Sequence, residues 1–469
     1  MNYKCVIGLE VHVELLTESK MFCSCKTKFG EKENTQCCPV CTGMPGALPT
    51  LNKQAVKLGI KTAKALNCKI SRKILFDRKN YFYPDLPKAY QISQFYTPLG
   101  YDGFVMTDDK KINIKEMHLE EDAGKLIHSG EKSYIDFNRC SVPLVEIVTQ
   151  PDFENANQVI AFLQKIKRDF EYLDVSDCKM QEGSMRVDVN LSLEKDGVTG
   201  NRTETKNLNS FKTIEKVIEL EIKRQSEILD KGGKVLQQTL RFDETEQSVY
   251  PMREKENVND YRYFPDPDLP VIVITDEEID EIVRSFPMLA DQREKKYIND
   301  FNLTKQDASC LTQSKIIADL FDYTQKICNN ALEVKKWILG PLLECVNDKG
   351  ILTENIKITP YQLSKIINLV LEGKISRQSA KLVLSNCIEN ENFDIESFIL
   401  NDNLILIDES DVIENAVKQV IEQNKKAVSQ YKQGENKVFT FLVGQCMKKL
   451  KGNGKAQTVN KILKEYLSK

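Results

Sequence analysis

The sequence predicts an α+β protein, in which a large domain on a mainly antiparallel β-sheet is followed by helical domains. Residues 1 to about 290 are rich in short β-like runs separated by Gly, Pro and Asn, whereas apolar residues beyond about 290 recur at helical spacing. A length of 469 residues fits about three domains. We therefore predict domains at residues 1–290, 291–405 and 406–469, of which the second and third are all-helical.

The first domain combines several predicted strands with two long helices. In residues 187–193 apolar and polar side chains alternate, which is the pattern of a strand with one buried face. Helical spacing appears at Asn155–Tyr172 and at Thr213–Leu229. The clearest strand-like runs are Cys5–Val13, Val142–Thr149, Met185–Leu193 and Val271–Thr275.

The middle domain contains a helix whose start and end are both marked in the sequence. Thr359 supplies an N-cap, and Pro360 suits the first helical position. Gly373 suits the end of the helix. The apolar stripe between these signals consists of Leu363, Ile366, Ile367, Val370 and Leu371.

The last segment is strongly basic. From Lys425 to Lys469 the chain has eleven lysines and two glutamates, a local charge of +9. Two apolar helical stripes, within residues 439–450 and 459–467, can pack against each other as a two-helix tail. The lysines form either an ordinary solvated face or a surface for nucleic-acid phosphates, and these residues alone leave both interpretations open.

The overall composition excludes several classes of protein. The chain has 66 basic and 69 acidic residues, a formal net charge of −3, which argues against a protein that grips nucleic acid over its whole surface. The first residues lack secretory or transit character, and no run approaches the ~18 apolar residues of a membrane helix. We expect a cytoplasmic protein whose 14 cysteines stay reduced.

Four cysteines have the spacing of a metal site. Cys23 and Cys25 form one close pair, and Cys38 and Cys41 form a second pair after twelve intervening residues. Four thiolates in two pairs suit a tetrahedral zinc ion, and such a closed site leaves no position for catalysis. Cys37 could compete as a ligand, and the alternative is a set of incidental reduced cysteines.

The first predicted strand carries polar side chains on one face. Glu10, His12 and Glu14 alternate with apolar residues, so two carboxylates and an imidazole share that face. Such a face can bind a divalent cation or manage protons, or it is simply the solvated side of a strand.

Two further acidic segments could complete a metal site. Glu120 and Glu121 closely follow His118, and Glu146 lies within a strongly apolar run. An acid in such a run must face a solvated cleft, pair with a cation or bind a metal. Acids from separated segments suit Mg²⁺, which prefers oxygen ligands. Sequence alone does not show that these acids converge.

Cations and aromatic rings interleave in residues 76–85, and residues 260–268 are similarly dense in both. Such a mixture stacks bases and neutralises phosphates, or it forms a loop with buried rings. The chain lacks the P-loop motif, the dinucleotide-binding glycine motif and the nucleophile-elbow motif. If the protein uses ATP, it therefore does so without a P-loop or a kinase motif.

Together these segments closely resemble the B subunit of the glutamyl/aspartyl-tRNA amidotransferase, a bacterial and organellar heterotrimer of A, B and C subunits. The resemblance runs essentially from end to end, and several of the motifs have no other common home. The motifs are Val6–Glu14, Cys38–Pro49, Phe76–Gln94, His118–Lys125, Pro143–Val148, Lys206–Phe211, Asp260–Pro270, Gly454–Ala456 and Val459–Leu463.

The resemblance implies a function. The family converts Glu-tRNA(Gln) to Gln-tRNA(Gln), or Asp-tRNA(Asn) to Asn-tRNA(Asn). The A subunit releases ammonia from glutamine; in the B subunit, ATP phosphorylates the side-chain carboxylate of the tRNA-bound amino acid, and ammonia displaces the phosphate. It also implies a cradle domain on an antiparallel sheet, a helical domain, a small tail that reaches the tRNA, and Mg²⁺ and zinc as cofactors.

The same resemblance implies roles for individual residues. His12, Glu121 and Glu146 match the Mg²⁺ positions, and the resemblance leaves open whether Glu120 or Glu121 faces the metal. Glu14 is assigned to the surface. The catalytic pocket is expected to include Glu10, Lys79, Tyr81 and Lys206. The expected zinc ligands are Cys23, Cys25, Cys38 and Cys41, and the expected tRNA contacts are Lys448, Lys449, Lys451 and Lys455.

Two other interpretations compete. A non-catalytic scaffold could present tRNA to a partner enzyme through a zinc knuckle and a basic tail, but such a platform has no use for Glu146 in an apolar strand. An archaeal-type relative, which works with an asparaginase-like partner, is disfavoured because the chain shows no large inserted domain. The sequence leaves open whether Gln-tRNA, Asn-tRNA or both are made.

Overall fold

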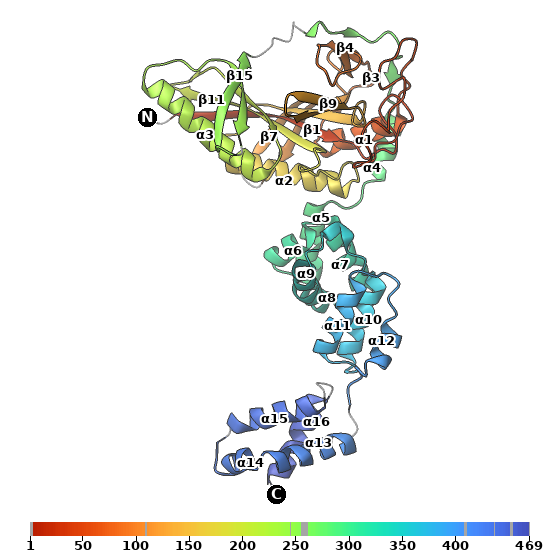
Figure 1. Cartoon of the computed structure of the whole chain (residues 1–469), viewed down its shortest axis with the longest axis vertical. Helices are drawn as coiled ribbons and strands as arrows, with labels where there is room; N and C mark the ends of the chain where they lie inside the picture. The colour runs from red at the N-terminus through yellow and green to blue at the C-terminus, as the bar shows by residue number, and fades with distance from the viewer. Residues whose placement is uncertain are drawn as a thin grey trace. The chain divides into compact units, whose positions relative to one another are not determined.

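The computed structural model of the chain describes residues 3–107, 110–243, 245–254, 261–407, 410–435, 437–450 and 454–468. The chain divides into two compact units, Met1–Leu289 and Ala290–Lys469. Figure 1 shows a large sheet with packed helices in the first unit and helices in the second, which confirms the predicted α+β class. Among the described residues, no helix has the length and apolarity needed to cross a membrane.

A ten-stranded sheet forms the centre of the first unit. Its strands run in the order β15-β14-β13-β11-β1-β10-β7-β6-β2, with β12 paired to β11, and all pairs are antiparallel except β13 with β14. The strands are β1 Lys4–Glu14, β2 Lys69–Ile70, β6 Gly100–Met106, β7 Lys111–Glu121, β10 Pro143–Thr149, β11 Met185–Lys195, β12 Val198–Thr199, β13 Thr203–Leu208, β14 Gln238–Asp243 and β15 Ser248–Glu254.

The side chains of the central strand β1 alternate between an apolar face and a polar face of the sheet. Leu9, Val11 and Val13 are buried with at most 1% of their surface exposed. Glu10 and His12, at the alternate positions, point to the opposite face because successive side chains of a strand alternate. The sequence therefore predicted both the strand and its two faces correctly.

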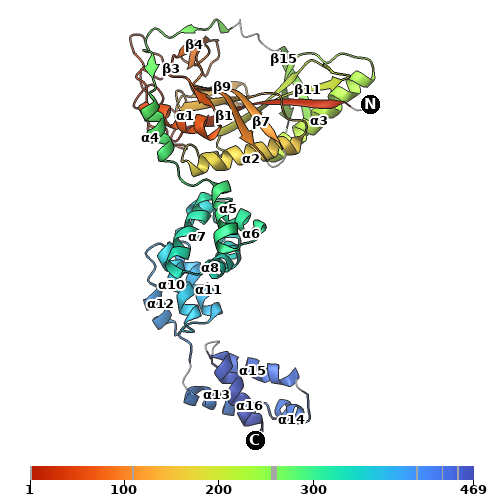
Figure 2. The same ribbon diagram turned by 180° about the vertical axis from the view of Figure 1, so that it is seen from behind.

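Three helices cover the apolar face: α1 (Lys53–Ala65), α2 (Ala156–Tyr172) and α3 (Phe211–Asp230). The residue before each helix caps it. A side-chain oxygen of Asn52, Asn155 and Ser210, respectively, accepts one or two hydrogen bonds from backbone N–H groups of the first turn. Seen from both sides, α2 and α3 lie on one side of the sheet, and the small sheet containing β4 lies on the other (Figures 1 and 2). Because these helices cover the apolar face, the polar face is available for a functional site.

Short strands form three small sheets in the same unit. β4 (Asp77–Asn80) pairs with β5 (Tyr90–Ser93) and with β16 (Phe264–Pro265), so the two segments rich in cations and aromatic rings lie side by side. The other two small sheets pair β3 (Lys73–Ile74) with β17 (Ile272–Val273) and β8 (Lys125–Ser129) with β9 (Lys132–Asp136).

Helices in the second unit pack around two separate hydrophobic clusters, one within residues 297–404 and one within residues 413–467. A domain boundary at residue 405 stays a prediction. The predicted helix after Thr359 is confirmed: α10 spans Pro360–Leu371, with a capping box between Thr359 and Gln362. The helices of the first cluster are α5 Ala290–Phe301, α6 Lys305–Thr312, α7 Lys315–Cys328, α8 Ala331–Trp337, α9 Leu343–Asp348, α10, α11 Arg377–Cys387 and α12 Ile395–Asn401, and α4 (Asp276–Arg284) precedes them in the first unit.

The basic tail has more helices than the sequence prediction of two. It packs α13 (Ser410–Gln423) and α14 (Lys425–Lys432) together with α15 (Lys437–Lys449) and α16 (Ala456–Ser468) around one apolar cluster. The two predicted stripes correspond to α15 and α16. Within the predicted segment, residues 425–469, the additional helix is α14. Helix α13 precedes that segment and adds Ile413 and Val417, both completely buried, to the same cluster.

Candidate active site

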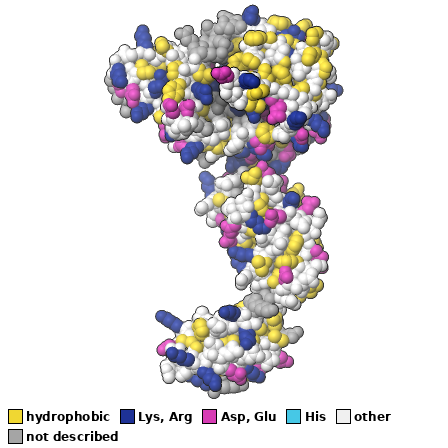
Figure 3. Space-filling model, viewed as in Figure 1, with side chains coloured by type: hydrophobic (Ala, Val, Ile, Leu, Met, Phe, Trp, Pro, Cys, Tyr) yellow, Lys and Arg dark blue, Asp and Glu magenta, His cyan; other side chains and the backbone are white. Residues whose placement is uncertain are grey.

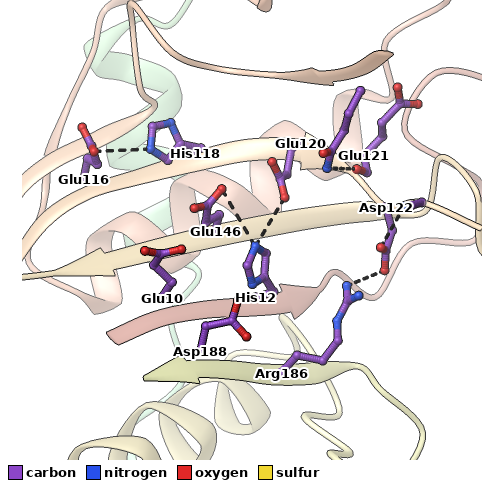
Figure 4. Close-up of polar contacts among 12 residues, drawn as sticks. Glu10, His12, Glu116, His118, Glu120, Glu121, Asp122, Glu146, Arg186 and Asp188 are labelled. Carbon is purple, nitrogen blue, oxygen red and sulfur yellow. Dashed lines mark hydrogen bonds and ion pairs between the residues drawn. The ribbon is translucent and has the colours of Figure 1, made fainter. Parts of the chain in front are cut away.

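The register of three neighbouring strands brings titratable side chains abreast on the polar face. His12 of β1 lies opposite Glu146 of β10, and Glu146 lies opposite His118 of β7. Glu120 follows His118 by two residues along β7, so its side chain points to the same face. Figure 4 shows Glu120 and Glu146 both directed at the His12 ring.

Three of these side chains form a group that fits a divalent cation. His12 Nε2 lies 3.7 Å from Glu120 Oε1 and 3.9 Å from Glu146 Oε2. The three donor atoms lie within 4.8 Å of one another. Within the described part of the chain, the buried Oε2 of Glu120 has no hydrogen-bond partner, and a buried polar atom without a partner is costly. An imidazole with two carboxylates supplies suitable ligands for such an ion.

The two carboxylates of this group differ in proton affinity. Burial, together with the negative charge of Glu146, raises the pKa of Glu120. Burial also opposes ionisation of Glu146, but His12 and Lys79 outweigh it and lower the pKa of Glu146 to about 2. Glu146 is therefore the member that stays ionised, and Glu120 is the member whose charge most needs a cation.

Glu121, which was expected at the Mg²⁺ position, does not belong to this group; Glu120, the alternative that the sequence left open, lies there instead. Adjacent residues of a strand point to opposite faces, and Figure 4 shows Glu121 directed away from His12. Its carboxylate forms a buried ion pair with Lys88 and accepts a 2.9 Å hydrogen bond from the backbone N of Ile92. Glu121 thus has a structural ion pair of its own.

A second acidic group lies beside the first one on the polar face. Asp188 of β11 lies opposite Glu10 in the strand register, and their carboxylates lie within 4.8 Å of Glu204 of β13. Lys206 Nζ is 3.7 Å from both Asp188 Oδ2 and Glu204 Oε1. Asn190 Nδ2 donates a 3.1 Å hydrogen bond to Glu10. The sequence analysis named Glu10 and Lys206 but missed Asp188 and Glu204.

A pocket of about 570 Å³ is lined by His12 and Glu120 of the first group and by Asp188 of the second. Lys79 reaches it from β4: burial opposes its charge, yet the carboxylates of Glu146 and Glu120 hold the pKa of Lys79 well above its ordinary value. Tyr81 also lines the pocket, and its hydroxyl donates a 3.2 Å hydrogen bond to Gln91. The lining residues include His12, Lys79, Tyr81, Phe82, Glu120, Asp122, Arg186, Asp188, Lys206 and Tyr261.

One end of the pocket is built by an ionic network that the sequence did not predict. Arg186 Nη2 lies 2.5 Å from Asp122 Oδ2, and Arg139 Nε lies 3.6 Å from the same oxygen. Glu14, which was assigned to the surface, is half-buried and adjoins this network. Burial and the negative charge of Asp122 raise the pKa of Glu14 to about 8, so it is largely protonated at neutral pH.

The four cysteines with metal-site spacing converge in space. The sulfur atoms of Cys23, Cys25, Cys38 and Cys41 lie within 4.8 Å of one another. Cys38 Sγ and Cys41 Sγ are 3.9 Å apart, close to the ~3.8 Å between thiolates around a tetrahedral zinc with ~2.3 Å bonds. Cys37 lies outside the group, and its thiol faces Asn138 Oδ1 at 3.8 Å. The quartet therefore fits zinc without Cys37.

The lysines of the tail are distributed over its helices. Lys448 and Lys449 are exposed in the last turn of α15, and Lys455 is half-buried just before α16. The fourth expected tRNA contact, Lys451, lies outside the described residues. Figure 3 shows several lysine side chains (dark blue) on the face of this segment that it draws.

Comparisons with known proteins match nearly the whole chain. The model of the GatB/GatE catalytic domain matches residues 5–280, and that of the GatB domain matches residues 319–467. The B subunit of the aspartyl/glutamyl-tRNA(Asn/Gln) amidotransferase of Caldicellulosiruptor bescii is 50% identical over 480 residues, covering 100% of both chains. The B subunit of the same enzyme in Lachnoclostridium phytofermentans is 45% identical over 475 residues, covering 100% of this chain and 99% of its own.

Proposed function

Because the chain belongs to the family of aspartyl/glutamyl-tRNA(Asn/Gln) amidotransferase B subunits, we propose that it amidates Glu-tRNA(Gln), Asp-tRNA(Asn) or both at the expense of ATP. First, the side-chain carboxylate of the tRNA-bound amino acid attacks the γ-phosphorus of ATP. The bond from that phosphorus to the β,γ-bridging oxygen breaks, and ADP leaves. Ammonia then attacks the acyl carbon, the bond to the phosphate oxygen breaks, and the new amide loses a proton.

The order of the two steps follows from leaving-group chemistry. A free carboxylate is a poor acyl donor because oxide or hydroxide is a poor leaving group, whereas phosphate is a good one. The first step brings two anions together, so the site must supply positive charge without much solvent. The observation that carries the proposal is that His12 and Glu120, which form one group with Glu146, line the same pocket as Lys79 and Lys206.

We assign the positive charge to two lysines that line the pocket and to a bound metal ion. Lys79 from β4 and Lys206 from β13 carry ammonium groups with raised pKa values, because nearby carboxylates outweigh the cost of burial. These two groups would contact phosphate or the substrate carboxylate. His12, Glu120 and Glu146 would hold Mg²⁺, which offsets charge on the transferring phosphoryl group. Their fixed register across three strands keeps the donor atoms in place before substrate arrives.

The mouth of the pocket suits the end of an RNA chain. Phe82 is 88% exposed and Tyr83 is 49% exposed, and both rings lie at the pocket. Exposed aromatic rings at a polar site are a stacking surface for unpaired bases, worth about 1–3 kcal/mol per base. An amino acid attached to the 3′ end of tRNA could reach His12 and Lys79 while the terminal base lies against these rings.

Zinc and partner subunits complete the proposal. The Cys23, Cys25, Cys38 and Cys41 site would be structural, because four thiolates leave no open coordination position. Ammonia would come from an amidase A subunit, and a small C subunit would complete the heterotrimer.

Reconstitution tests the activity. With the A and C partners, glutamine, ATP and Glu-tRNA(Gln) or Asp-tRNA(Asn), the amidated tRNA should form. Absence of both products with all components present would refute the proposal.

The tail should contribute to tRNA affinity through phosphate contacts. Replacing the exposed Lys448 and Lys449 together with Gln should weaken tRNA binding and reduce the slope of log affinity against log salt by about one unit or more. Ending the chain after Leu406 should weaken binding by about tenfold or more, because it removes the whole basic segment. Filter binding at several salt concentrations measures both effects.

ATP cleavage by the same variants is the internal control. It depends on residues of the first unit, so it should survive the loss of the tail. An unchanged salt slope in the double variant would show that these lysines only form a solvated face.

A further inference from the structure

Lys20 is a fully buried lysine that the proposed chemistry does not use. Its exposed fraction is 0%, yet the polar contacts of its ammonium within the described residues include no carboxylate. Its ammonium instead lies 3.6 Å from Cys41 Sγ and donates a 3.1 Å hydrogen bond to the carbonyl oxygen of Phe137. Lysine is almost never fully buried unless an anion accompanies it. The sulfur of Cys41 is the group available for that role.

The surroundings of Lys20 hold it against the cysteine quartet. The backbone N of Lys20 donates a 2.9 Å hydrogen bond to the carbonyl oxygen of Cys25. Cys41 is also buried, and its carbonyl oxygen accepts a 3.2 Å hydrogen bond from the Cys140 thiol. Lys20 thus contacts both halves of the quartet, the one before and the one after the twelve-residue loop, and the segment around Phe137.

We propose that Lys20 is the charge-balancing residue of the zinc site, whose buried ammonium stabilises the metal-loaded quartet through Cys41. Four thiolates around Zn²⁺ carry a net charge of −2, and such a dianion next to a protein core is costly unless a cation accompanies it. Groups that contact metal ligands in this way typically change metal affinity by about 10- to 100-fold. The inference rests on the proposed zinc site.

The test compares substitutions of Lys20 in the full-length chain. Lys20→Met removes the charge and keeps the volume, whereas Lys20→Gln removes the charge but keeps a donor for Phe137. Lys32→Met changes an exposed lysine of the same loop and serves as the matched control. Zinc affinity is measured by competition with a chromogenic chelator, and Co²⁺ substitution reports thiolate coordination through its charge-transfer absorption.

Both Lys20 variants should bind zinc about 10- to 100-fold more weakly than the natural chain and the Lys32→Met control. The metal-free Lys20→Met protein should unfold at the same temperature as metal-free natural protein or a higher one, because an apolar side chain replaces a buried charge. The zinc-induced rise in Tm should be smaller in both variants. A purely structural role would instead lower the Tm of the metal-free and loaded forms equally.

Other outcomes have distinct meanings. If Lys20→Gln keeps the natural affinity, Lys20 acts only as a hydrogen-bond donor and the inference is overturned. If Lys20→Met fails to fold, Lys20→Gln alone decides by the same comparison. If the natural chain binds neither zinc nor Co²⁺ through thiolates, the zinc site itself is wrong, which is a different failure from unchanged affinity in the variants.

Discussion

Glu146→Gln should lower the rate of tRNA amidation by about 10²-fold or more, while glutamine hydrolysis by the A subunit stays measurable. Glu146 is the carboxylate held ionised between His12 and Lys79. Glutamine has nearly the same shape but no charge, so the variant would lose one ligand of the proposed metal site and the anion that pairs with Lys79. The expected loss corresponds to about 3 kcal/mol of transition-state stabilisation.

Two measurements locate the defect. Formation of amidated tRNA and release of ADP should fall together, because the first chemical step fails. Binding of Mn²⁺, measured by electron paramagnetic resonance, should weaken. Glu154→Gln is the matched control, because this exposed glutamate lies outside the pocket and pairs with Lys110. Amidation retained in the Glu146 variant would remove this residue from the reaction site.

Adjacent glutamates at the end of β7 should respond to the same substitution in opposite ways. Glu121→Gln should lower the stability of the first unit by about 3 kcal/mol, because it leaves the buried ammonium of Lys88 without its anion. For a domain of this size, that cost corresponds to a fall in Tm on the order of 5–10 °C. Binding of Mg²⁺ or Mn²⁺ should remain, since the Glu121 side chain points away from His12.

Glu120→Gln should show the reverse pattern. Burial and the charge of Glu146 already disfavour the Glu120 carboxylate, so a neutral amide should leave the Tm of the metal-free protein unchanged or higher. Metal binding and amidation should nevertheless fall, amidation by about 10²-fold. Each variant is the control for the other, and thermal unfolding with and without Mn²⁺ measures both. A stable, active Glu120→Gln protein would contradict the assignment of Glu120 to the metal group.

These adjacent glutamates also show where sequence-based reasoning stops. The alternation in β1 predicted a strand and its polar face, because the side-chain period of a strand is a local property. Which of Glu120 and Glu121 faces His12 depends on the phase of β7 relative to β1, two strands away in the sheet. That phase is set by backbone pairing through β10, which a local pattern does not encode.

Other differences have similar causes. Asp188 alternates with apolar residues in β11, so its place on a polar face was predictable, but its position opposite Glu10 was not. The strand β4 is composed of polar and charged residues, so no hydrophobic period marks it, and one of its two partners, β16, comes from a distant segment. Lys20 gave no signal, because a lysine in a sequence is ordinarily expected at the surface. Helix α13, by contrast, has an apolar stripe that the sequence analysis overlooked.

The position of β1 in the middle of the sheet has a consequence for how the polypeptide acquires its structure during synthesis. Residues 4–14 pair with β10 at residues 143–149 and with β11 at residues 185–195. The chain must therefore grow by more than a hundred residues before the first strand gains any neighbour in the main sheet. Through that interval β1 has no partner strand, so we expect early ribosome-bound chains to need protection from aggregation. The strand that presents His12 is thus among the first parts made, yet it waits for partners that are made much later.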